Sequence, residues 1–177
     1  MTEKAILELA SKEGFSAARI IDVKNIPFDH SFRNYCEDNL CGQYGTNYSC
    51  PPFCGSPAEM EKRIRVYKKA LVLQSKWAID FRDHEAIRTA KVSHNNAMMR
   101  IIEKLRQHGH NSLMCGASCC SLCDPCAASE GNPCNSPHLK FSCLSAYCVY
   151  VRKLADFCYM DYNCPDGKVA FFGVYAF

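Results

Sequence analysis

Residues 56–79 read SPAEMEKRIRVYKKALVLQSKWAI and contain the clearest structural signals in the chain. Ser56 is a favoured residue for a helix N-cap, Pro57 suits the first helical position, and Glu59 completes an S-x-x-E capping box. The largely apolar segment at 70–79 predicts a buried strand directly after this helix. A capped helix followed at once by a buried strand is typical of a layered α/β or α+β domain.

The segments on both sides of this unit continue the alternation of helices and strands. Helices are expected at about 3–12, 83–107 and 144–157, and strands at about 16–23, 111–115 and 168–177. Two further segments, 36–54 and 115–137, are rich in cysteine and are named here the first and the second cysteine loop. The sequence therefore predicts a single α/β or α+β domain over 1–177, a layered scaffold with two long metal-binding loops.

The composition is that of an ordinary soluble domain except for its cysteines. Hydrophobic residues make up 48% of the chain, and 177 residues are enough to bury a full core without disulfide staples. The amino-terminal segment is charged at positions 3, 4, 12 and 13, unlike a secretory signal, and no apolar stretch reaches the length of a membrane span. We therefore expect a cytoplasmic protein whose 14 cysteines stay reduced and favour metal binding, with a secreted disulfide protein as the alternative.

The formal net charge of +3 is too small and too scattered to indicate a nucleic-acid partner. A [4Fe-4S] cluster with four thiolates adds about −2, so two such clusters would bring the chain to about −1. The net charge of the polypeptide therefore says little about partners.

The second cysteine loop contains Cys120, Cys123, Cys126 and Cys134 in the spacing C-x2-C-x2-C-x7-C. Three cysteines at successive x2 spacing can bind three irons of one cubane, and a more distant fourth completes the set, as in bacterial ferredoxins. Structural zinc sites usually pair two separated C-x2-C units. The spacing favours a [4Fe-4S] cluster, and zinc or free or disulfide-bonded thiols are the alternatives.

Cys115 and Cys119 lie just outside this spacing. The adjacent side chains of Cys119 and Cys120 tend to diverge, so they are poorly suited to bind one ion together. For Cys119 a small buried residue and a ligand are equally good interpretations.

The first cysteine loop contains Cys36, Cys41, Cys50 and Cys54 in the spacing C-x4-C-x8-C-x3-C. Glycines at 42 and 45 permit tight turns around a bulky cofactor. These features indicate a second metal site, and loop cysteines without a metal are the alternative. Nearer the C-terminus, Cys158 and Cys164 are free thiols or further ligands, and the Cys164-Pro165 pair also fits an ordinary turn.

Together the two loops resemble a family of predicted metal-binding proteins, the domain of unknown function 2284. The resemblance is carried by C-x4-C-x2-Y-G-x4-C-P-P at 36–52, the capped helix and strand after it, C-x2-C-x2-C-x7-C-x2-P at 120–137, SAYCVYV and the terminal FFGVYAF. It covers the chain from about residue 17 onward. It implies metal binding through an iron–sulfur group and implies no particular reaction.

The family pattern has three cysteines in the first loop, which match Cys36, Cys41 and Cys50. Cys54 is an addition in this sequence, and cysteines at 119, 143 and 148 stand where the resemblance leads us to expect small residues without a thiol. A cubane held by Cys36, Cys41 and Cys50 alone leaves one iron open to a substrate, whereas a cubane that Cys54 also binds has four thiolates and mainly carries electrons.

The sequence thus supports an iron–sulfur protein with one or two [4Fe-4S] clusters, the first of them in the second loop and the other, where the first loop also binds metal, in that loop. Its expected work is electron transfer with a redox partner protein, or redox chemistry on a small molecule, and whether it is an enzyme stays open. The rival hypothesis is a non-enzymatic zinc protein whose cysteine sites are structural.

Overall fold

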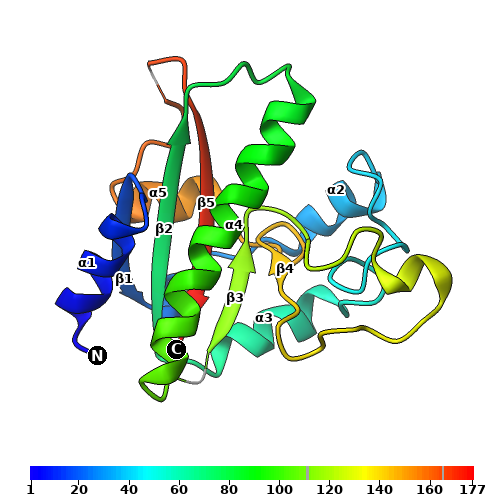
Figure 1. Cartoon of the computed structure of the whole chain (residues 1–177), viewed down its shortest axis with the longest axis horizontal. Coiled ribbons are helices and arrows are strands. Elements are labelled where there is room, and N and C mark those ends of the chain that lie inside the picture. Colours follow the sequence, from blue (N-terminus) through cyan, green and yellow to red (C-terminus); the bar gives the residue numbers. More distant parts are fainter. Residues whose placement is uncertain (111, 165) are drawn as a thin grey trace.

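A five-stranded mixed sheet is the centre of the computed structural model, which describes residues 1–110, 112–164 and 166–177 (Figure 1). Its strands lie in the order β1-β2-β5-β3-β4. Their bounds are β1 (Ala17–Asp22), β2 (Lys69–Trp77), β3 (Leu113–Gly116), β4 (Ser142–Cys143) and β5 (Val169–Ala176). β2 runs antiparallel to both β1 and β5, β3 runs antiparallel to β5, and β4 is parallel to β3. The predicted α/β or α+β class is confirmed.

Helices cover both faces of this sheet. The helices are α1 (Glu3–Lys12), α2 (Arg33–Glu37), α3 (Pro57–Arg65), α4 (His84–Gln107) and α5 (Val151–Phe157). In Figure 1, α4 crosses in front of the sheet and α5 lies behind it. Within the described residues, every helix is too short or too polar to cross a membrane.

The alternation of side chains along β2 divides the core into two clusters. Leu71 and Leu73 pack with α1 and α4, while Ala70 and Val72 pack with α3 and α5 on the other face. Because both faces are covered, the central part of β2 is buried residue after residue, which explains its largely apolar sequence.

The capping box and the proline at the start of α3 are found at the predicted residues. The Ser56 hydroxyl accepts from the Glu59 amide, the Glu59 carboxylate accepts from the Ser56 amide at 2.8 Å, and Pro57 begins α3. On the opposite face, a Cβ at Gly173 of β5 would lie 2.7 Å from Met98 Cε and 2.9 Å from His94 Nε2. This glycine therefore lets α4 approach the sheet closely.

Three boundaries differ from the prediction. The helix expected at 144–157 begins only at Val151, because Val149 forms a bridge with Phe28 and Cys148 takes a positive φ of 57°. A short helix, α2, was not expected; it leads into the first cysteine loop and contains Cys36. The third strand runs over Leu113–Gly116, and Asn111, where it was expected to start, lies outside the described residues.

Candidate metal centre

Both cysteine loops lie at one end of the molecule, beyond β3 and β4 (Figure 1). The second loop follows β3, and its first residues are positioned by Asn95, a fully buried residue of α4. Its Oδ1 accepts a hydrogen bond from the Ala117 amide at 2.9 Å, and its Nδ2 donates to Ser118 Oγ at 2.9 Å. The long helix therefore fixes the direction in which the chain enters the cysteine-rich segment.

The four predicted ligands of the second loop line one small cavity, together with side chains of both loops. Its walls are Asn47, Tyr48, Cys120, Leu122, Cys123, Cys126, Cys134, Ser136 and Lys140. Burial raises the pKa of Cys120, and the nearby Cys134 and Cys126 add to this shift. Asn135 Nδ2 lies 3.8 Å from Cys123 Sγ and donates to it. The structure therefore brings all four thiols together.

The spacing of these thiols is wider than a single ion requires. Among the described residues, no three Cys, His, Asp or Glu side chains converge closely enough to hold one metal ion. The cavity has an open volume of about 10 Å³, roughly the space of one water molecule. A zinc ion, with sulfurs at about 2.3 Å, would need the thiols to turn inward, whereas a cubane binds each thiolate to a different iron and accepts a wider spacing. The donor set suits either group.

Cys119 turns away from this cavity and contacts Cys50 of the first loop. The neighbouring Cys50 and Cys119 side chains interact, which raises the pKa of Cys50 and lowers the pKa of Cys119. Cys119 Sγ also lies 3.7 Å from Gln43 Oε1. The expected divergence of Cys119 and Cys120 is therefore present, and the two residues face different groups of thiols.

Asn47 and Ser49 join the first loop to the second at this point. Asn47 Nδ2 donates to the Cys120 carbonyl at 3.1 Å, and Ser49 Oγ accepts from the Cys120 amide at 2.9 Å. Asn47 Oδ1 in turn accepts from the Ser49 amide and hydroxyl. Because these polar groups are buried, the hydrogen bonds hold the loops in one fixed relation.

Cys143 of β4 belongs to the same neighbourhood as the first-loop thiols. Burial raises the pKa of Cys143 to about 12, and the nearby thiols of Cys36, Cys119 and Cys41 contribute to this shift. The Cys143 sulfur accepts a hydrogen bond from the Ala146 amide at 3.4 Å. We name the five thiols of Cys36, Cys41, Cys50, Cys119 and Cys143 the first thiol group.

Cys54 lies on the other side of Cys36, next to Cys148 and a buried arginine. Arg33 donates to the carbonyls of Gly55 and Ala146, each at 2.9 Å, and its buried Nε has no hydrogen-bond partner among the described residues. Burial raises the pKa values of Cys36, Cys54 and Cys148, and the positive charge of Arg33 opposes that shift in all three. A buried cation among thiols stabilises thiolates and any anionic centre that they hold.

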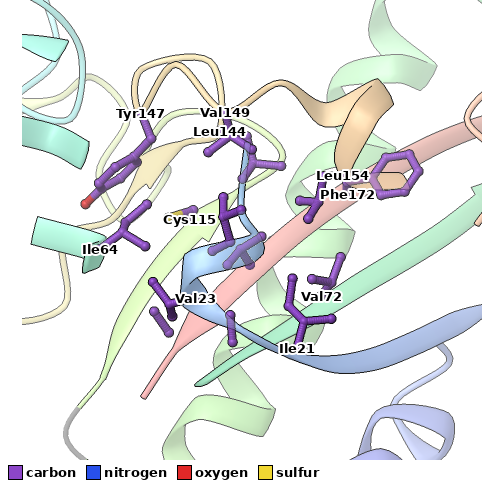
Figure 2. Packing of buried hydrophobic residues seen from close by; sticks show 14 of the residues in the cluster. Ile21, Val23, Ile64, Val72, Cys115, Leu144, Tyr147, Val149, Leu154 and Phe172 are labelled. Carbon is purple, nitrogen blue, oxygen red and sulfur yellow. The ribbon is translucent and has the colours of Figure 1, made fainter. Parts of the chain in front are cut away.

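The remaining cysteines are buried in the hydrophobic core or lie away from the thiols of the two cysteine loops. Cys115 is fully buried, and Figure 2 shows it among Val23, Leu144 and Val72 in the cluster behind the sheet. Cys158 is also buried in that cluster. Cys164 lines a separate surface groove before β5, and Pro165, which follows it, lies outside the described residues.

Sequence reasoning missed the position of Cys119 and Cys143 beside the first loop. The adjacent pair Cys119-Cys120 contained a usable signal, since diverging neighbours can serve two sites. Cys143 carried no such signal, because only the pairing of β4 with β3 brings it to this place.

No curated protein and no solved structure matches this chain. One family model does match it, over residues 19–175. That match spans both cysteine loops, the scaffold between them and nearly all of β5. The chain therefore belongs to the family described as predicted metal-binding protein (DUF2284).

Proposed function

We propose that this metal-binding protein holds two iron–sulfur centres and works in electron transfer or in redox chemistry on a small molecule. The observation that carries the proposal is the division of adjacent cysteines: Cys120 lines the second-loop cavity, and Cys119 contacts Cys50 in the first thiol group. Because the peptide bond between Cys119 and Cys120 joins the two groups of thiols, two metal centres bound by these groups would lie close together.

The second-loop centre would be held by Cys120, Cys123, Cys126 and Cys134. Their C-x2-C-x2-C opening favours a [4Fe-4S] cluster over zinc, because each successive thiolate can bind a different iron. A cluster bound there supplies a one-electron carrier. The surrounding chain supports such a carrier, because Asn135 donates toward Cys123 and thereby favours the thiolate.

The first-loop centre would be held by Cys36, Cys41 and Cys50, with Cys119 as the fourth thiolate. Cys119 is favoured over Cys54 because it contacts Cys50 directly. Cys54 also lies near Cys36, but its thiol is grouped with Cys148 and Arg33. The unpartnered Nε of Arg33 near Cys36 further supports a negatively charged centre at this place.

This assignment favours electron transfer over chemistry at an open iron. With Cys119 included, each centre has four thiolates, so neither leaves a vacant iron position for a substrate. Cys123, Cys126 and Cys134 are partly exposed, and most side chains between them face solvent. A redox partner protein can therefore approach the second centre closely.

The test is the metal and sulfide content of protein purified without oxygen. We expect close to eight irons and eight sulfides per chain, and about half of each in Cys126→Ser. Cys158→Ser is the matched control, because it removes a buried thiol that lies in the core, and it should keep the full content.

Stoichiometric zinc without labile sulfide would overturn the iron–sulfur proposal and leave the structural zinc hypothesis. Equal metal content in the wild type and in Cys126→Ser would show that the second loop holds no metal.

A further inference from the structure

A second, much larger cavity lies beside the second-loop cysteines. Its volume is about 820 Å³, within the range of roughly 300–1,000 Å³ that is usual for small-molecule sites. The walls come from the C-terminal half of α4, from β3, from α3 and from the segment 138–142. Cys54 of the first loop lines this space, and the four cysteines of the second loop do not.

Positive charge dominates the side chains around the cavity. Arg63, Arg100, Arg106 and Lys140 line it, against the single carboxylate of Glu103. Arg100 is neutralised by Glu13, at 2.6 Å between Nε and Oε2. Among the described residues, the other three cations form no ion pair. A ligand of negative charge would therefore meet unneutralised cations here.

The floor of the cavity is apolar and also offers hydroxyl groups. Ile102, Met114 and Phe141 are buried and contribute hydrocarbon surface. The hydroxyl of Ser112 accepts from Tyr175, and Tyr147 is buried in the wall. A cavity lined by apolar side chains, hydroxyl groups and cations fits a molecule with a hydrophobic body and an anionic head.

The cavity adjoins the second-loop centre through two shared side chains. Tyr48 and Lys140 line both the large cavity and the small cysteine cavity. The Lys140 ammonium lies 6.0 Å from the centroid of the Tyr48 ring, an interaction that holds the two together at the boundary. These two side chains therefore form a boundary between the large cavity and the second-loop cysteines.

We propose that this cavity binds a small organic anion with an apolar or aromatic body, with Arg106 and Lys140 pairing with its charged group. Binding of the anion does not need a metal. Its further role, as the molecule that exchanges electrons with the second-loop centre, rests on the function proposed above. The substrate class would then be an organic carboxylate or phosphate.

The probe for the test is phenyl phosphate, and benzyl alcohol is its uncharged counterpart. Calorimetric titration of the anaerobically purified protein should show saturable binding of phenyl phosphate and much weaker binding of benzyl alcohol. The double variant Arg106→Gln/Lys140→Gln should bind phenyl phosphate at least about tenfold more weakly. Lys4→Gln/Lys12→Gln removes the same charge from the exposed surface of α1 and should bind like the wild type.

The proposal is overturned if phenyl phosphate does not bind, if benzyl alcohol binds as tightly, or if the two double variants bind alike. Two further measurements separate this result from the metal proposal. Arg106→Gln alone, at a residue that lines only the large cavity, should keep the full iron and sulfide content while it binds phenyl phosphate more weakly, and Cys126→Ser should still bind phenyl phosphate. Loss of metal together with intact anion binding would contradict only the iron–sulfur function.

Discussion

The thiols of Cys50 and Cys119 are neighbours that shift each other's pKa in opposite directions, although the two residues belong to different loops. Cys120, the next residue, lies in the other group of thiols. The two loops therefore pack against each other, and the peptide bond between Cys119 and Cys120 joins the two groups of thiols.

Replacing Cys119 tests the ligand set of the first-loop centre. If Cys119 is the fourth thiolate, Cys119→Ser should lose or convert the first-loop cluster and change its absorption and electron paramagnetic resonance spectra. Cys54→Ser, in the same region, should leave both spectra unchanged. The reverse outcome, a normal Cys119→Ser and an altered Cys54→Ser, would make Cys54 the ligand.

Replacing Asn135 tests the second-loop centre through a change in its reduction potential. The amide of Asn135 donates to Cys123, and hydrogen bonds to ligand sulfur favour the reduced, more negative cluster. A difference of about 0.5–1.5 kcal/mol between the two redox states corresponds to roughly 20–60 mV for one electron. Asn135→Ala should therefore lower the potential in a redox titration. An unchanged potential would mean that Cys123 is not bound to the redox centre.

Asn95 should be the main anchor of the second loop on the scaffold. Asn95→Ala leaves the half-buried Ala117 amide without its acceptor, which costs about 1–3 kcal/mol. The free energy of unfolding should fall by that amount, and the iron content should fall with it. Asn96→Ala, an exposed neighbour on α4, is the control and should change neither. Equal stability of both variants would contradict the anchoring role.

The stability of the protein should fall at acid pH because of one buried histidine. Burial lowers the pKa of His94 from 6.5 to about 4, while its Nδ1 stays hydrogen-bonded to Ser75 at 2.7 Å. Below pH 6.5 the unfolded chain takes up a proton that the folded chain refuses, so stability decreases as pH falls toward 4. The loss is of the order of 3 kcal/mol.

The measurement is urea unfolding at several pH values, on the wild type and on His94→Gln. The stability difference between the two proteins should depend on pH between 6.5 and 4, because only the wild type carries the histidine. A difference that stays constant over this range would show that His94 titrates normally in the folded protein.

Much of the scaffold could be predicted from the sequence because its signals are local. The capping box at Ser56 and the apolar segment of β2 each act within a few residues, and both were found as expected. The helix expected from Leu144 was too long, because the bridge between Val149 and Phe28 is a long-range contact. Local pattern alone does not contain that contact.

The candidate site shows the same division. The four cysteines of the second loop are close in sequence, and the structure gathers them at one cavity. The position of Cys143 depends on the pairing of β3 with β4. The large cavity forms because side chains of α3, α4 and β3 come together in the tertiary structure. Neither follows from the spacing of cysteines.

The most direct test of the central claim is native mass spectrometry of the intact protein purified without oxygen. The account predicts an added mass of two groups of four irons and four sulfides, with one group lost in Cys126→Ser and the other lost in Cys50→Ser. An added mass of zinc ions alone would contradict this prediction. So would an added mass of two clusters that is unchanged in both Cys126→Ser and Cys50→Ser.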